Sequence, residues 1–219
     1  MKNFPFLIQG VIVLLILAGC TKSNKNVQPV NSILVLQPTN NPNEITLVNN
    51  NGTDNSGITI EMPVEAWTNG GTPFTIREVF KYDLSTIPAS ASVTAADLAL
   101  YSDTIPINGN LTDANYGDSN AVLVESVTQD WNPSTVNWFN QPTTSSTLID
   151  TIPQTNSSFL NVDVDVTGIV SNMIKTNVNY GFLLKMQSEI TYNSRIFCSS
   201  SYSDTTRHPK LTVHYTYTP

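Results

Sequence analysis

Acidic, imidazole and thiol side chains are the residues of this sequence that could carry out catalysis. Asp163 and Asp165 stand at i and i+2, and a pair of carboxyl groups can cleave a glycosidic bond. His208 and His214, joined by Arg and Tyr on one sheet face, could supply the acid and base of a lyase. Acids at this spacing are more often a solvated strand face, and the sequence contains no G-x-S-x-G or H-E-x-x-H motif. We therefore expect a protein without catalytic activity.

Cys198 and the Asn-rich segment 49–57 give weaker indications of a functional site. Cys198 shares a strand parity with Ile196, where a lone Cys is usually a small buried hydrophobic residue. Asp54 stands in the run 49–57, which is typical of a loop. The same run could instead supply oxygen ligands to a structural calcium ion, with Asp54 as the metal-ligand candidate. No cofactor is required by these patterns.

Charge narrows the choice of partner. The chain of 219 residues has 10 basic and 17 acidic side chains, a formal charge of −7. A negative protein is repelled by phosphate backbones, so we expect no nucleic acid partner.

Apolar residues recur at strand spacing throughout, which indicates a folded β protein.

The segment 77–101 is the part of the chain that the other elements must be arranged around. Two runs of alternating residues predict two strands, because side chains of a strand point alternately to its two faces. Pro88 interrupts them, since proline has no N–H for a strand ladder. The predicted core positions are Phe80, Tyr82 and Leu84 in the first run and Ala96, Leu98 and Leu100 in the second.

Further alternating segments extend the β prediction. They lie at 32–37, 44–48, 58–67, 121–128, 148–152, 159–166, 182–186, 195–199 and 211–217. Over 167–175 the period changes, and Ile169, Val170, Met173 and Ile174 lie on one face of a short helix for which Thr167 is a candidate N-cap. We predict an all-β fold, a two-sheet antiparallel β-sandwich of jelly-roll type with one short helix.

The first residues predict where the protein is located and do not form part of the folded domain. Lys2 and the apolar run 6–17 are typical of a secretory signal, and L-A-G-C, ending at Cys20, resembles a bacterial lipobox. By that resemblance residues 1–19 are a lipoprotein signal peptide and Cys20 is the lipid attachment site. Residues 20–31 would form a flexible tether and 32–219 one domain. We expect a bacterial cell-envelope lipoprotein, anchored in the outer membrane, with its domain in the periplasm or at the cell surface.

Several motifs in order resemble one family. They are R-E-V-F-K-Y-D-L-S-T-I-P (77–88), A-D-L-A-L-Y (96–101), W-N-P-S-T-V-N-W-F-N-Q-P (131–142), V-D-V-T (164–167), N-Y-G-F-L-L-K (179–185) and P-K-L-T-V-H-Y (209–215). Over 33–215 the chain is similar to the DNRLRE-domain proteins, also classed as carbohydrate-binding module family 96. The resemblance implies a β-sandwich that serves as an accessory or stand-alone module, and some members bind uronic-acid polysaccharides such as alginate.

The resemblance also points to basic site residues. Arg77 and Lys81 match the family's basic positions and could hold a uronate carboxylate. Lys185 and Arg195, from later strands, could add to that surface. The alternative is internal pairing with Asp83 or another carboxylate. Without residues 1–19 the charge becomes −8, because Lys2 is lost, so a neutral glycan is as well supported as alginate.

Aromatic side chains are the other candidates for a sugar site. Trp67, at a predicted loop edge, and Tyr116 and Tyr202, in predicted loops, could stack on a sugar ring, and the alternative for all three is loop packing. For Trp131 and Trp138 we expect core packing.

Three functional hypotheses follow. The first is a membrane-anchored, non-catalytic carbohydrate-binding module for a uronic-acid or neutral polysaccharide. The second is a structural or adhesive surface lipoprotein without a glycan site. The third is an accessory of a polysaccharide lyase or hydrolase.

Overall fold

The computed structural model describes residues 27–49 and 59–219. Within them the chain forms twelve strands, one α-helix and two short 3-10 helices. The strands are β1 (Val30–Leu36), β2 (Glu44–Val48), β3 (Glu61–Asn69), β4 (Thr72–Phe80), β5 (Ser92–Leu100), β6 (Asn115–Tyr116), β7 (Val122–Val127), β8 (Thr144–Ile152), β9 (Val162–Asp165), β10 (Phe182–Met186), β11 (Asn193–Cys198) and β12 (Lys210–Tyr217). The helices are α1 (Thr167–Thr176), η2 (Trp138–Asn140) and η3 (Thr205–Arg207).

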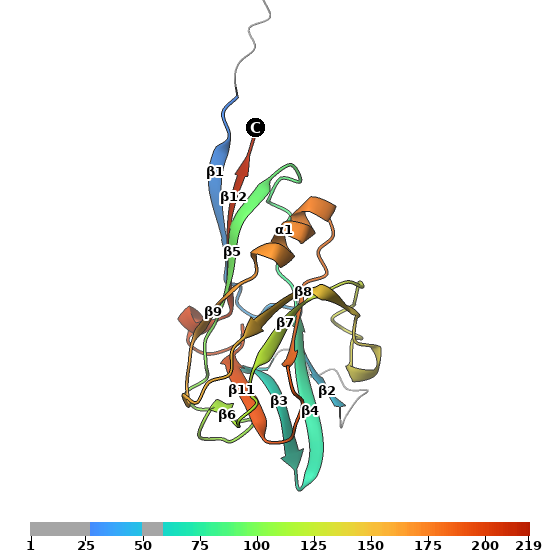
Figure 1. The fold of residues 1–219 in the computed structure, drawn as a ribbon, viewed down its shortest axis with the longest axis vertical. Helices are drawn as coiled ribbons and strands as arrows, with labels where there is room; N and C mark the ends of the chain where they lie inside the picture. Colours follow the sequence, from blue (N-terminus) through green and yellow to red (C-terminus); the bar gives the residue numbers. More distant parts are fainter. Residues whose placement is uncertain (1–26, 50–58) are drawn as a thin grey trace, which may run out of the picture.

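The strands form two antiparallel sheets, which confirms the predicted β-sandwich with one helix (Figure 1). The smaller sheet has four strands in the order β1-β12-β5-β9. The larger has eight, in the order β6-β11-β3-β4-β10-β7-β8, with β2 also paired to β4. The start of β1 and the turn between β3 and β4 lie at opposite ends of the molecule (Figure 1).

The main core lies between the sheets and is closed by α1, which packs against β5 and β8. The predicted apolar face of the helix is confirmed, because Ile169, Val170, Met173 and Ile174 are all buried. The predicted N-cap is displaced by one residue. Val166 occupies that position without a side-chain cap, and the Thr167 hydroxyl instead accepts a hydrogen bond from the Ala96 N–H at 2.8 Å.

The 77–101 segment joins the two sheets. β4 belongs to the larger sheet and β5 to the smaller one, so residues 81–91 cross between them. The prediction that the first strand continues to Leu84 is wrong, because β4 ends at Phe80. Tyr82 and Leu84 are nevertheless buried, each 5% exposed, since the crossing segment keeps its apolar side directed at the core.

A tight hairpin joins β3 and β4 and places Trp67 in a strand. Asn69 pairs with Thr72, and the turn residues Gly70 and Gly71 have φ of +57° and +85°. Two left-handed residues match the twist of paired strands, and glycine adopts that conformation without steric cost. The predicted strand 58–67 continues to Asn69, so Trp67, expected where that strand meets a loop, lies within β3 and pairs with Phe74.

Three expectations concern residues beyond those described. The signal peptide, Cys20 and the calcium candidate Asp54 lie within 1–26 and 50–58, outside the described residues. β1 begins at Val30, inside the expected tether. Among the described residues, no helix has the length and apolar character needed to cross a membrane.

Candidate functional site

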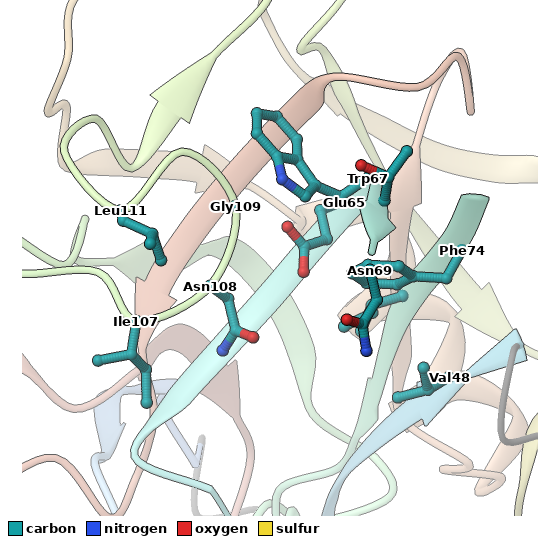
Figure 2. Close-up of a pocket in the computed structure, with 11 residues that line it drawn as sticks. Val48, Glu65, Trp67, Asn69, Phe74, Ile107, Asn108, Gly109 and Leu111 are labelled. Atoms are coloured by element: carbon teal, nitrogen blue, oxygen red, sulfur yellow. The ribbon is translucent and has the colours of Figure 1, made fainter. Parts of the chain in front are cut away.

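A cavity with a volume of about 680 Å³ lies beside Trp67. We call it the Trp67 groove. Figure 2 shows Ile107, Asn108 and Leu111 on one side and Phe74, Asn69 and Val48 on the other, with Glu65 and Trp67 between them. Apolar rings and methyl groups are thus mixed with amide groups, the composition that suits a ligand carrying both C–H faces and hydroxyl groups.

Two buried glutamates lie beneath one wall of the groove. The Ile107 N–H and the Asn108 side-chain amide donate to Oε1 and Oε2 of Glu61, both at 2.7 Å. Neither carboxyl oxygen of Glu65 has a hydrogen-bond partner among the described residues. Burial, followed by the charge of Glu61, raises the pKa of Glu65 to about 8. Glu65 is therefore mostly uncharged at neutral pH.

Trp67 is the centre of an aromatic cluster, which we define as Trp67, Tyr116 and Tyr192. The ring of Tyr116 lies 5.4 Å from that of Trp67 and the ring of Tyr192 lies 5.2 Å from it, both edge to face. Tyr116 is 39% exposed and Tyr192 is 53% exposed. Large apolar rings at this exposure can contact a ligand without unfolding of the domain.

Tyr202 is not part of this cluster. Its hydroxyl donates to Oδ1 of Asp103 at 3.1 Å, and the Arg207 guanidinium lies 5.3 Å from its ring centre. The structure therefore brings together two of the three predicted aromatic residues, Trp67 and Tyr116, and holds Tyr202 elsewhere by its own contacts.

Arg77 lies on the opposite face of the larger sheet. Ile76 lines the Trp67 groove, and successive side chains of a strand point to opposite faces, so Arg77 points away from the groove. Its Nε and Nη2 donate to the two carboxylate oxygens of Glu189 at 2.7 and 2.9 Å. Its Nη1 donates to Gln141 at 2.8 Å. Arg77 was expected either to bind a uronate carboxylate or to pair with a carboxylate of this chain. In the structure it pairs with Glu189.

The other basic candidates have separate environments. Lys185 forms an ion pair with Glu125 at 2.9 Å. Lys81 lies 5.2 Å from the centre of the Trp131 ring and forms no ion pair within the described part of the chain.

Arg195 requires a correction, because it is 0% exposed and cannot contribute to a surface. Its Nη1 donates to the Pro153 carbonyl at 3.0 Å, and burial lowers its pKa to about 10.

The segment 128–143 covers the face of the sheet on which Arg77 lies. Trp131 is buried, 7% exposed, and its indole N–H donates to the Tyr180 carbonyl at 2.7 Å. Trp131 belongs to a buried apolar group that includes Val79 and Leu183. Trp138 packs partly buried against that group, with the Arg77 guanidinium 4.5 Å from the centre of its ring. The core-packing prediction is confirmed for Trp131, and for Trp138 it holds in part.

The carboxylate candidates for catalysis lie at the surface. Asp163 and Asp165 are exposed and, with Asp150, line a cavity of about 300 Å³. Hydrogen bonds from Thr167 lower the pKa of Asp165, whereas burial and the charge of Asp165 raise that of Asp150. Opposite shifts are the pattern of an acid–base pair, but no aromatic side chain lines this cavity as a platform for a sugar.

The imidazole and thiol candidates come from different parts of the fold, since His208 follows η3, His214 lies on β12 and Cys198 lies on β11. His208 is buried, and its ring nitrogens lie 3.1 and 2.8 Å from the backbone oxygens of Pro38 and Tyr202. Cys198 is 0% exposed, as predicted for a structural cysteine, and burial raises its pKa to about 12. Within the described ranges no three His, Cys, Asp or Glu side chains are placed to hold a metal ion.

Sequence reasoning missed Tyr192, Phe74 and Asn108. Tyr192 precedes β11 and has a left-handed backbone with φ of 71°. The surrounding I-T-Y-N-S carries no Gly that would signal this conformation, so only the folded chain places its ring beside Trp67. Phe74 could have been found as the cross-strand partner of Trp67 if the Gly-Gly hairpin had been recognised.

Comparison with known proteins identifies a family for this chain. A sequence model of carbohydrate-binding module family 96 matches residues 37–215, most of the chain. A search of curated proteins finds no match.

Proposed function

This chain belongs to carbohydrate-binding module family 96, and on that premise we propose that it binds an uncharged polysaccharide in the Trp67 groove without cleaving it. The observation that carries the proposal is the groove itself, in which Trp67 stands between a 680 Å³ cavity and two exposed tyrosines. An aromatic ring packs on the C–H face of a sugar, and Asn69 and Asn108 can hydrogen-bond its hydroxyl groups.

Charge supports an uncharged ligand. Among the residues that the structure describes, no Lys or Arg lines the Trp67 groove, and Glu61 and Glu65 lie beneath it. A uronate would enter without a counter-charge, close to carboxyl groups that ionise as the pH rises, in a chain of formal charge −7. Hydroxyl groups of a neutral sugar meet no such penalty.

A second candidate is a uronate site on the opposite face of the sheet, and one observation favours it. Lys81 lies over Trp131, where its ammonium forms no ion pair within the described residues. Arg77 and Lys185 lie on the same face, but Glu189 and Glu125 already neutralise them. A uronate would have to displace those partners, so we rank this site below the Trp67 groove.

The test is affinity electrophoresis of the full-length chain in a mild detergent. Gels contain soluble β-glucan, xylan or galactomannan as neutral polymers and alginate as the charged one. We expect a neutral polymer to retard the chain and Trp67→Ala to weaken retardation about tenfold, since one stacked ring is lost. Phe139→Ala is the matched control, because Phe139 is 75% exposed and lies on another segment.

Other results would redirect the proposal. Retardation by alginate alone, lost in Lys81→Ala and weakened by salt, would move the site to the Arg77 face. No retardation by any polymer would favour the structural or adhesive hypothesis. Release of new reducing ends, abolished in Asp150→Asn, would contradict binding without cleavage.

We also propose that Cys20 carries a lipid that holds the domain at the outer membrane. The start of β1 and the β3–β4 turn lie at opposite ends of the fold, so an anchor before β1 would direct the Trp67 end away from the membrane (Figure 1). Metabolic labelling with an alkyne fatty acid is expected to mark the wild-type chain and Cys198→Ala but not Cys20→Ser. Label retained in Cys20→Ser would contradict the anchor.

A further inference from the structure

A second cavity of about 510 Å³ adjoins the aromatic cluster. Tyr116 and Tyr192 line it, and both rings contact Trp67, which lines the Trp67 groove. We propose that this second cavity is a further sugar-binding subsite, so that the two cavities together bind an extended stretch of an uncharged polysaccharide. The inference rests on the proposed function and adds to it the length of ligand required.

Tyr192 is held in a conformation that its side chain does not favour. Its φ is 71°, in the left-handed region that a bulky residue rarely adopts. Its backbone N–H donates to the Ala66 carbonyl at 2.7 Å, which fixes it beside the strand that carries Trp67. The ring is 53% exposed. Backbone strain of this kind gathers at binding sites, where it presents a side chain that packing alone would bury.

The two walls of the second cavity are fastened to each other. The Asn193 side-chain amide donates to the Ile190 carbonyl at 2.9 Å, and its oxygen accepts from the Ser119 N–H at 2.7 Å. Gly117 allows this approach, because a Cβ there would lie 2.3 Å from the Tyr192 carbonyl oxygen. The backbone segments that carry Tyr116 and Tyr192 are therefore held together before any ligand arrives, so less backbone freedom is lost on binding.

The chemistry of the second cavity resembles that of the first. Asp118 and Thr191 supply polar groups, and none of the described residues that line the second cavity is Lys or Arg. Rings 5.2 and 5.4 Å from Trp67 continue the apolar surface from one cavity into the other. A chain of uncharged sugars can thus pack on Trp67 and then on a tyrosine, whereas a single sugar can occupy only one cavity.

The test uses the full-length chain in detergent and isothermal titration with β-glucan, xylan and mannan oligosaccharides, from disaccharides to octasaccharides. We expect wild-type affinity to rise with length, and Tyr192→Ala to lower octasaccharide affinity roughly tenfold while leaving disaccharide affinity unchanged. Tyr192→Gly is the variant that keeps the fold, since glycine accepts the left-handed φ, and it should bind as Tyr192→Ala does. Tyr202→Ala, outside both cavities, should match wild type.

The outcomes separate this inference from the proposed function. If affinity does not depend on length, or if both Tyr192 variants bind octasaccharides as wild type does, while Trp67→Ala weakens binding, the second subsite is wrong and the Trp67 groove stands. If no oligosaccharide binds the wild-type chain, both are wrong.

Discussion

Gly117 is the residue on which the geometry of the aromatic cluster depends. Its φ is +87°, and a Cβ added there would lie 2.3 Å from both the Asn193 Oδ1 and the Tyr192 carbonyl oxygen. Gly70 also has a positive φ, +57°, but a Cβ there would meet nothing within 4 Å. The two glycines therefore separate the cost of a left-handed backbone from the cost of a steric clash.

Gly117→Ala should lower the free energy of unfolding by about 3 kcal/mol, and Gly70→Ala by about 1 kcal/mol, the cost of the left-handed backbone alone. Urea unfolding monitored by tryptophan fluorescence measures both. Equal losses in the two variants would mean that the 117 and 192–193 segments do not press on each other as described.

At the scale of one element, the segment 128–143 acts as a cover for the larger sheet. Trp131 packs on Val79 and Leu183 and bonds the Tyr180 carbonyl, so it is buried as a core residue is. Phe139, on η2 of the same segment, projects into solvent. The cover thus depends on Trp131, while Phe139 contributes little to stability.

Trp131→Ala should lower the unfolding free energy by about 4 kcal/mol, because a large buried ring and its hydrogen bond are both lost. Phe139→Ala should change it by less than about 0.5 kcal/mol. Thermal denaturation by circular dichroism compares the two. A small effect of Trp131→Ala would show that the segment is not packed on the sheet.

Two strand predictions differ in outcome for the same physical reason. Alternation located β5 closely, because Ala96, Leu98 and Leu100 face the core between the sheets. It extended the preceding strand to Leu84, because residues 81–84 still alternate between core and solvent although no neighbouring strand pairs with them. Alternation reports burial, and strand pairing is a separate property that it does not encode.

At the scale of the whole molecule, four glutamate side chains are buried on strands β2, β3 and β4 of the larger sheet. Burial raises the pKa of Glu44 and Glu61 to about 7, that of Glu65 to about 8 and that of Glu78 well above 4.5. The unfolded chain releases these protons near pH 4.5, whereas folded Glu44, Glu61 and Glu65 keep theirs to about pH 7 or 8 and Glu78 also keeps its proton well above pH 4.5. The folded state thus binds more protons across that window, so its stability falls as the pH rises.

We expect the unfolding free energy to decrease by several kcal/mol between about pH 5 and pH 8, since one carboxyl whose pKa is raised by about 2 pH units contributes about 3 kcal/mol by itself. Glu65→Gln removes one titrating group and should make the decrease smaller. Asp118→Asn, at an exposed site, should leave it unchanged. Denaturant unfolding across this pH range measures the slope, and stability that rises toward pH 8 would contradict the buried-acid account.

The sequence alone determined the fold class, the buried face of α1 and the family. It also supplied two residues of the candidate site, Trp67 and Tyr116. Period-two and helical patterns survive in a linear string because they record which residues face a core, and the ordered motifs between 77 and 215 identify the family. Trp67 and Tyr116 were candidates from residue type alone.

Only the tertiary structure decided which candidates meet. Arg77 is adjacent in sequence to Ile76 but faces the other side of the sheet, where Glu189, 112 residues away, neutralises it. Arg195 was predicted to be a surface cation but is buried. Tyr192 lies beside Trp67 because its φ is left-handed and its N–H donates a hydrogen bond to the Ala66 carbonyl. These contacts between residues far apart in the sequence depend on strand order and on local backbone angles. The spacing of residues along the chain encodes neither strand order nor backbone angles.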